Sequence, residues 1–391
     1  MRSYVHLKLL KEIFSTYQYP EPFQIHLRKF FRKNKSCGSK DRRVLRDLAY
    51  VYLRLGNALK DESFEVRLLV IHFICRDQTT ELIDWLKREH QPDFPDHSKE
   101  KTREKLKAIQ KLYPQFKKED IFPAFDQISS EIDLEYFIQQ HFSRPPAFLK
   151  ALKNSGKELE EDLNKSQISY KKENEHLFKV ESGANFSELK SVKDGVTIVS
   201  DLTVDLLARE FQPREGESWW DACAGSGGKA LHLLAKNPAI KLWATDNRET
   251  ILENLRKRTR DAGLPPSSIE KAELTHPNEP PEQKFDHIIA DLPCSGSGTW
   301  NRNPEHLIYF GKESVHEYRQ QQQKILENVW KGLKEGGELW VVTCSVYETE
   351  NEQNVKEFLQ KHEGTLLKDG YIKGYEHDSI TLYRALIRKN A

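Results

Sequence analysis

Two cysteines occupy similar places in the pattern of the chain, each after a short apolar run and before a polar turn. Cys344 follows "LWVVT", and Cys294 follows "HIIADLP" and opens a glycine-serine turn. Apolar runs of this length are typical of buried strands, so both thiols are expected at strand ends. A cysteine there is most often a small buried hydrophobe. Its thiolate can also act as a nucleophile in covalent catalysis.

A glycine-rich segment, "WWDACAGSGGKALHLLA" (219–235), leads from a predicted strand into a predicted helix. Glycines let the backbone approach a ligand closely, and the first amides of the helix are free to bind it. The segment is no Walker loop, because Cys223 replaces the required first glycine and an alanine follows Lys229. The pattern therefore indicates a nucleotide-type site of another kind.

The same loop fits G-x-G-x-x-A at Gly225, Gly227 and Ala230, with Asp246 about twenty residues further on. This pattern alone is compatible with a nicotinamide-dependent oxidoreductase, because Asp246 could accept the ribose hydroxyls of either cofactor. Asp221 favours S-adenosylmethionine, since a carboxylate at the strand mouth repels a pyrophosphate and attracts a cationic amino acid moiety.

Three segments in order, "DACAGSGGK", "ADLPCSGSGTWNRNPEHL" and "TCSVYETEN", resemble the motif set of the RNA (cytosine-5) methyltransferases of the Sun/NSUN type. Upstream, "GSKDRRVLRDLAYVYLRL" and "RPPAFLKAL" resemble the helical and pre-catalytic regions of the ribosomal-RNA members. The resemblance implies an α/β fold, with a Rossmann-like class I methyltransferase domain after an α-helical N-terminal domain. It also implies formation of 5-methylcytosine in RNA, most of all ribosomal RNA, with S-adenosylmethionine as cofactor.

The resemblance also implies roles for single residues. It makes Cys344 the thiol that adds to carbon-6 of cytosine, which turns the ring into an enamine able to attack a methyl sulfonium. It makes Cys294 the thiol that helps to eliminate the enzyme, Asp291 the hydrogen-bond partner of the base, and Lys229 a contact of base or cofactor. The loop and the resemblance together give the expected cofactor residues Asp221, Cys223, Ala224, Gly225, Ser226, Gly227, Gly228, Lys229, Asp246, Glu273 and Asp291.

The chain departs from the family pattern at several positions. Ser226 stands where the family usually has proline, and Ala230 where it usually has threonine. Glu273 stands where an aspartate usually contacts the adenine, and "HDSITLYRALIRK" replaces the usual glycine-phenylalanine ending. The departure at the C-terminal end concerns contacts with RNA rather than the cofactor site.

Composition narrows the class of protein. The 391 residues are 37% hydrophobic and 31% charged, and no stretch approaches the roughly 18 apolar residues of a membrane span. The first twenty residues do not read as a signal peptide, so a cytoplasmic protein without a membrane is expected. The five cysteines form no C-x-x-C pair and have no histidine cluster near them, which argues against a metal site and a disulfide framework.

The expected elements place the motifs at one edge of a sheet. Strands are predicted at "SWWDAC", "KLWATD", "FDHIIAD" and "ELWVVTC", with helices near 229–236, 249–262 and 313–333. Ligands of such sheets bind outside the carboxyl ends of the strands. The residues expected to gather there are Cys223, Asp246, Asp291, Cys294 and Cys344.

Three domains are predicted: an α-helical, basic, RNA-binding domain over 1–130, a small α/β RNA-binding subdomain over 131–195, and the methyltransferase domain over 196–391. Net charge is +1, yet residues 1–60 carry fourteen Lys or Arg and four Asp or Glu, which favours a polyanionic partner. A monomer acting on ribosomal RNA is expected. The alternatives are a transfer-RNA methyltransferase, an inactive RNA-binding assembly factor and the oxidoreductase, which leaves both thiols unexplained; a DNA cytosine methyltransferase would use the Pro-Cys thiol alone.

Overall fold

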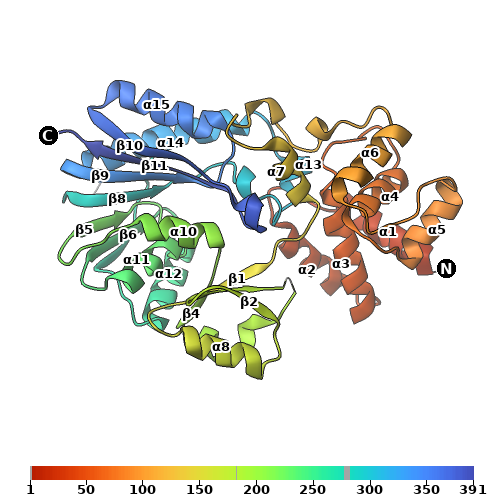
Figure 1. The fold of residues 1–391 in the computed structure, drawn as a ribbon, viewed down its shortest axis with the longest axis horizontal. Helices are drawn as coiled ribbons and strands as arrows, with labels where there is room; N and C mark the ends of the chain where they lie inside the picture. The colour runs from red at the N-terminus through yellow and green to blue at the C-terminus, as the bar shows by residue number, and fades with distance from the viewer. Residues whose placement is uncertain (1, 182, 277–281) are drawn as a thin grey trace. The chain divides into compact units, whose positions relative to one another are not determined.

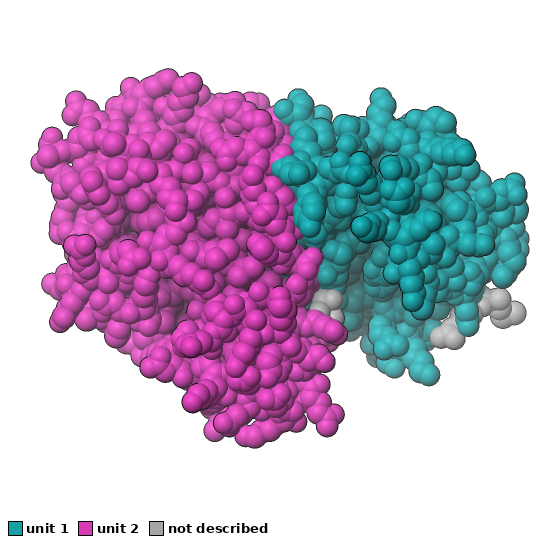
Figure 2. Space-filling view, viewed as in Figure 1, with its two compact units in different colours: residues 1–126, 133–144, 300–312 teal, residues 127–132, 145–299, 313–391 magenta. Residues whose placement is uncertain are grey.

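The computed structural model describes residues 2–181, 183–276 and 282–391. The chain forms two compact units, coloured separately in Figure 2. The helical unit comprises Met1–Asp126, Asp133–Arg144 and Trp300–Lys312, and the sheet unit comprises Gln127–Ile132, Pro145–Thr299 and Glu313–Ala391. The division into functional domains near residues 130 and 195 stays a prediction.

The helical unit consists of amphipathic helices around one core, with α4 buried on nearly all sides. Polar side chains cap several helices: Ser63 accepts from the amide of Val66, and Asp133 from that of Tyr136. The buried guanidinium of Arg54 donates to backbone carbonyls before and after the excursion into the sheet unit. The helices are α1 (Arg2–Ser15), α2 (Phe23–Lys33), α3 (Ser39–Leu53), α4 (Phe64–Cys75), α5 (Glu81–His90), α6 (Thr102–Leu112), α7 (Leu134–His141) and α13 (His306–Tyr309).

The sheet unit begins with a small antiparallel sheet of order β2-β3-β1-β4. Leu149 and Phe178 from this sheet pack with Leu159 and Leu163 from α8 in a core of their own. The elements are β1 (Ala147–Ala151), α8 (Gly156–Lys165), β2 (Tyr170–Asn174), β3 (Leu177–Val180), α9 (Lys190–Lys193) and β4 (Thr197–Ser200).

The large sheet has the order β10-β11-β9-β8-β5-β6-β7 (Figure 1). Strand β11 pairs antiparallel with both β10 and β9, and the other pairs are parallel. The strands are β5 (Ser218–Asp221), β6 (Lys241–Asp246), β7 (Ser268–Lys271), β8 (Phe285–Asp291), β9 (Leu333–Thr343), β10 (Gly364–Ile372) and β11 (Leu382–Lys389). The helices are α10 (Leu202–Glu210), α11 (Gly228–Lys236), α12 (Glu249–Asp261), α14 (Ser314–Lys331) and α15 (Glu352–Lys361).

Helices cover both faces of the large sheet, and consecutive residues of the central strands pack against opposite faces. Trp220 and Ile288 pack in the core that holds α14 and α15. Their chain neighbours Trp219 and Ile289 pack in the core that holds α10 and α11. Successive side chains of a strand point to opposite faces, so consecutive apolar residues such as Trp219 and Trp220 serve both cores. Among the described helices, none is both long and apolar enough to cross a membrane.

The structure contains strands that the sequence analysis did not predict. The edge strand β7 has no buried residue, and β10 has one, Gly370. Neither segment therefore shows the apolar run of a central strand. The antiparallel pair β10 and β11 extends the sheet beyond the four predicted strands.

Candidate active site

The carboxyl ends of β5, β6, β8 and β9 border a cavity of about 490 Å³ in the sheet unit. A volume of this size suits a small-molecule ligand. Seven of the predicted site residues line it: Cys223, Gly225, Asp246, Glu273, Asp291, Cys294 and Cys344.

The glycine loop between β5 and α11 forms one wall of this cavity. Gly225 and Gly227 have φ values of +53° and +82°, a region that favours glycine. A Cβ on Gly227 would also lie 3.1 Å from the Cγ of Leu255 in α12. The amide of Gly225 donates to the Asp246 carboxylate at 3.0 Å, which ties the loop to the end of β6.

Asp246 is a buried carboxylate whose charge is well supported. Arg248 donates to it from its backbone amide and from its guanidinium, at 2.9 to 3.0 Å. Burial opposes the charge, but these hydrogen bonds and that of Gly225 outweigh burial and lower the pKa of Asp246. Arg248 lines the cavity as well, and the sequence analysis did not identify it.

The two thiols lie side by side at the cavity, with Cys294 Sγ 3.5 Å from Cys344 Sγ. Both cysteines are free. The hydrogen bond with Cys344 and then burial raise the pKa of Cys294 well above its usual range. Cys294 is therefore a protonated thiol at neutral pH that can share its proton with the neighbouring sulfur.

Lys229, in the first turn of α11, reaches across to the end of β8. Its ammonium group donates to Asp291 Oδ2. Burial opposes the charge of Lys229, but the Asp291 carboxylate outweighs burial, and Asp221 and Cys344 add to it, so that the pKa of Lys229 is raised. A permanent cation thus acts on both the Asp291 carboxylate and the Cys344 sulfur.

A buried carboxylate, Glu350, joins the two cysteine loops, and sequence reasoning missed it. It is 1% exposed. It accepts hydrogen bonds from the amide and hydroxyl of Ser295 at 2.9 and 2.5 Å, and from the hydroxyl of Ser345 at 2.5 Å. The Gln322 amide donates to Glu350 at 3.2 Å and to the carbonyl of Pro293 at 2.9 Å. Because Ser295 and Ser345 directly follow the two cysteines, this network fixes the separation of the thiols.

Several predicted residues do not line the cavity. Asp221 lies beneath the loop and is 1% exposed, and burial raises its pKa to about 7. Cys223 does line the cavity, although burial raises the pKa of its thiol and keeps it protonated. The other predicted residues outside the lining are Ala224, Ser226, Gly227, Gly228 and Lys229.

The charges of the lining limit what the cavity can bind. Asp246, Glu273 and Asp291 are acidic, and Arg248 is basic but engaged by Asp246. An acidic lining attracts a cationic ligand and repels a pyrophosphate. The site therefore suits a sulfonium nucleoside better than a dinucleotide.

Residues 208–382 match the model of one protein family, described as 16S rRNA methyltransferase RsmB/F. The ribosomal RNA small subunit methyltransferase B of Erwinia tasmaniensis is 31% identical over 238 residues, 59% of this chain and 52% of that protein. The protein of the same name from Citrobacter koseri is 27% identical over 299 residues, 73% of this chain and 65% of that protein. The chain thus covers between half and two thirds of the length of these relatives.

Solved structures share the fold. The crystal structure of PH0851 has a TM-score of 0.67, covering 94% of this chain and 95% of that one at 20% identity. The crystal structure of NSun6 from Pyrococcus horikoshii with SFG, an S-adenosylmethionine analogue, has a TM-score of 0.59 at 16% identity. It covers 66% of this chain and 94% of that one. These likenesses confirm the Rossmann-like class I methyltransferase fold.

Proposed function

We propose that this protein transfers a methyl group from S-adenosylmethionine to carbon-5 of a cytosine in RNA, because residues 208–382 match the family model described as 16S rRNA methyltransferase RsmB/F. The observation that carries the proposal is the pair of sulfur atoms 3.5 Å apart at an acid-lined cavity. A single nucleophilic thiol would need no second thiol beside it. Two thiols suit a reaction in which a covalent bond to the base is first made and then broken.

The cavity residues fit the proposed cofactor. Asp246 lies where its carboxylate can accept ribose hydroxyls once Arg248 yields part of its contact. Asn247 donates to Glu273 at 3.0 Å, which holds that carboxylate at the cavity for the adenine side. When bound, S-adenosylmethionine supplies an electrophilic methyl group. The roles of Asp221 and the remaining loop residues in holding it stay predictions.

The proposed reaction assigns a separate task to each thiol. The Cys344 thiolate adds to carbon-6 of cytosine, and the electron pair this addition places on carbon-5 takes up the methyl group. The proton on carbon-5 then leaves to a base, the bond between sulfur and carbon-6 breaks, and the Cys344 thiolate is restored. Cys294, whose raised pKa keeps it protonated, assists this elimination at the neighbouring sulfur.

Lys229 and Asp291 complete the proposed machinery. The Lys229 ammonium group places a positive charge near the Cys344 sulfur. Asp291 lies at the cavity and is oriented by Lys229, so that it can accept a hydrogen bond from the amino group or protonated ring nitrogen of the base. Such oriented groups stabilise charge as it develops on the ring.

A basic surface on the helical unit supports RNA as the substrate. Seven exposed cations lie on α2, on α3 and on the turn between them, and none has an ion-pair partner among the described residues. Contacts of such cations with phosphates supply affinity that is independent of sequence. We call this set the basic face: Arg28, Arg32, Lys33, Lys35, Lys40, Arg43 and Arg46.

The names of the relatives favour ribosomal RNA over transfer RNA. The second candidate function, an RNA-binding assembly factor without activity, would not need two thiols held at 3.5 Å by a buried network. A monomer in the cytoplasm remains the expectation for this protein.

The proposal is tested with purified protein, labelled S-adenosylmethionine and 16S rRNA or transfer RNA. Cys344→Ala should abolish methylation, and Cys294→Ala should accumulate a covalent protein–RNA complex on a denaturing gel. Cys75→Ala is the matched control, because burial raises the pKa of that thiol to about 11 and keeps it unreactive. Bisulfite sequencing identifies the product base. Methylation by Cys344→Ala at the rate of the unmodified protein would refute the two-thiol reaction.

A further inference from the structure

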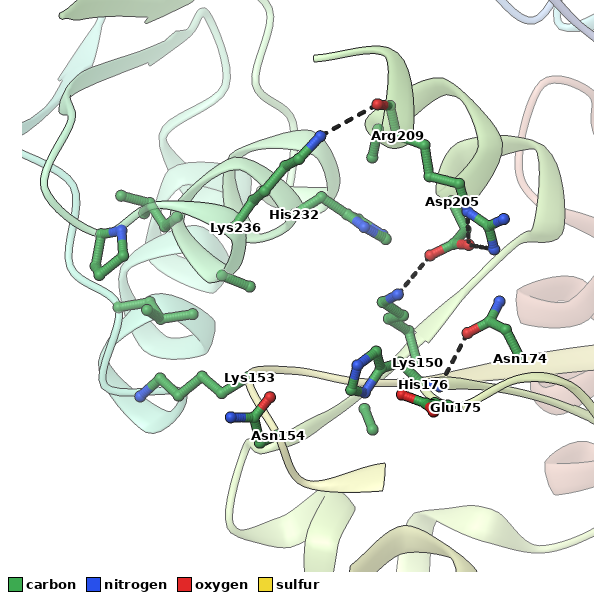
Figure 3. Close-up of a pocket in the computed structure, with 16 residues that line it drawn as sticks. Lys150, Lys153, Asn154, Asn174, Glu175, His176, Asp205, Arg209, His232 and Lys236 are labelled. Atoms are coloured by element: carbon green, nitrogen blue, oxygen red, sulfur yellow. Dashed lines mark hydrogen bonds and ion pairs between the residues drawn. The ribbon is translucent and has the colours of Figure 1, made fainter. Parts of the chain in front are cut away.

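A second cavity in the sheet unit, of about 900 Å³, lies between the small sheet and helices α10 and α11 (Figure 3). The described residues that line it share no member with the thiol cavity. We call it the basic groove. Its charged lining residues are Lys150, Lys153, Glu175, Asp205, Arg209 and Lys236.

Four cations against two carboxylates give the basic groove a surplus of positive charge. Asp205 is 2% exposed and accepts from Lys150 Nζ at 2.5 Å and from Arg209 Nη2 at 2.7 Å. One buried carboxylate therefore serves two cations, as Figure 3 shows. The Arg209 side chain is still 54% exposed, which leaves donors free for a ligand.

Lys153 and Lys236 are held at the groove by neutral partners. Lys153 Nζ donates to the carbonyl of Ala262 at 2.9 Å, and Lys236 Nζ donates to the carbonyls of Phe211 and Arg209. Carbonyls fix the positions of the ammonium groups without neutralising their charge. Each ammonium has three N–H donors, so each can also bind an anion. Burial lowers the pKa of Lys236, so an anion beside it would be favoured.

The lining indicates which part of a polyanion would bind. No phenylalanine, tyrosine or tryptophan is among the described residues of the lining, so the groove offers no platform of these rings for stacked bases. Ammonium and guanidinium groups match phosphate oxygens. The ligand expected from this chemistry is the backbone of a nucleic acid strand and not its bases.

Helix α11 connects the basic groove with the thiol cavity. Lys229 in its first turn contacts Asp291, and Lys236 at its end lines the groove. Seven residues of helix span roughly 10 Å. One RNA strand could therefore contact the groove while its target base lies at the thiols.

We propose that the basic groove binds phosphates of the RNA substrate, apart from the cofactor site and apart from the basic face. This inference rests on the proposed function, because it assumes that RNA is the substrate. The groove positions the strand that carries the target base and takes no part in the chemical step.

The test compares Lys153→Gln/Lys236→Gln with the control Lys165→Gln/Lys171→Gln, which removes the same charge from exposed side chains of the small-sheet region outside the groove. RNA affinity is measured over a range of KCl concentrations. Loss of two phosphate contacts should make the negative slope of log K against log salt shallower by about 1.4 for a single strand. KM for RNA should rise, while kcat and the affinity for S-adenosylmethionine stay the same.

An additional variant distinguishes a loss of charge from a loss of stability. Lys153→Arg/Lys236→Arg keeps both charges and should restore the slope, whereas a variant that merely weakens the fold would not be restored. A slope equal to that of the unmodified protein, or a groove that responds only to inorganic phosphate, would overturn the inference. If the slope changes but the unmodified protein methylates no RNA, the groove stands and the proposed function fails.

Discussion

Glu350 shows how a single side chain can set the distance between two reactive atoms. Its two oxygens accept hydrogen bonds from Ser295 and Ser345, and each serine directly follows one of the cysteines. Burial raises the pKa of Glu350, while these donors favour its charged form. The thiol pair therefore depends on a carboxylate that lines neither cavity.

Replacing Glu350 by alanine should leave its buried donors without an acceptor. Each unsatisfied buried group costs about 1–3 kcal/mol, so the free energy of unfolding should fall by several kcal/mol. The kcat for methylation should fall while KM for S-adenosylmethionine changes little, because the thiols and not the cofactor site are displaced. Glu350→Gln keeps one acceptor oxygen and should recover part of both values. Urea unfolding and steady-state kinetics measure them; wild-type kcat in Glu350→Ala would exclude a positioning role.

The raised pKa of Asp221 leads us to expect a specific dependence of stability on pH. Its pKa is about 7 in the folded protein and about 3.8 as a free side chain. Between these values the folded state holds a proton that the unfolded state has lost, so this group's contribution to stability decreases as pH rises from about 4 to about 7. Asp221→Asn mimics the protonated acid and should lack this decrease. Urea midpoints of both proteins across this range test it, and parallel curves would contradict it.

The sequence could predict the reactive residues but not those that hold them. Cys294 and Cys344 stand in motifs that pair an apolar run with a characteristic turn. Glu350 lies in "YETEN", which reads as a solvated polar turn, because nothing local indicates that Ser295 from the other cysteine loop lies beside it. Arg248 was missed because the sequence does not show that its guanidinium folds back onto the Asp246 carboxylate.

At the scale of elements, Gly298 couples the two cysteine loops through the backbone. Its amide donates to the carbonyl of Cys344 at 2.8 Å, and its carbonyl accepts from the amide of Thr381 at 3.0 Å. A Cβ at this position would lie 2.3 Å from the Thr381 carbonyl oxygen and 3.0 Å from that of Cys344. The close approach thus permits no side chain.

Gly298→Ala should separate the loop of Cys294 from the end of β9. We expect a lower melting temperature and a reduced kcat, with unchanged binding of S-adenosylmethionine by titration calorimetry. Gly216→Ala is a control for the change of residue type, because a Cβ there meets no atom within 4 Å, although its φ of +81° adds local strain. Equal activity of Gly298→Ala and the unmodified protein would show that the loops tolerate displacement.

Burial separates the predicted strands from the two edge strands of the large sheet, but β11 was not predicted although most of its residues are buried. The parallel strands β5, β6, β8 and β9 each contain a short run of buried apolar residues, because helices cover both faces, and this run is visible in the sequence. Strands β7 and β10 lie at the sheet edges, where solvent removes the pattern. Their formation depends on pairing with neighbouring strands, which a local pattern does not show.

At the scale of the whole molecule, the unequal distribution of charge predicts the salt dependence of RNA binding. Arg32→Gln/Arg43→Gln removes two cations of the basic face. The negative slope of log K against log salt should become shallower by about 1.4. The loss should be similar for RNAs of different sequence, because phosphates carry no sequence information. The control Lys111→Gln/Lys117→Gln removes two exposed cations elsewhere on the helical unit. Anisotropy titrations measure both, and a sequence-dependent loss would argue against phosphate contacts.

The sequence does not show which segments belong to which compact unit. The segment Trp300–Lys312 belongs to the helical unit although it follows the Cys294 motif directly. Trp300 stacks on Phe122, and Tyr19 contacts His306 at 3.0 Å, contacts between residues far apart in the sequence. Local patterns predict helices and strands, but they do not tell which distant segments pack together.

The closeness of the two sulfurs has a consequence for the chemistry of the resting protein. At 3.5 Å they are near enough for a small movement to bring them to the bonding distance of about 2.05 Å. Hydrogen peroxide would take two electrons and two protons from the pair and leave water and a cystine bridge. We expect this treatment to abolish methylation and dithiothreitol to restore it. The activity would then depend on the redox state of the surroundings.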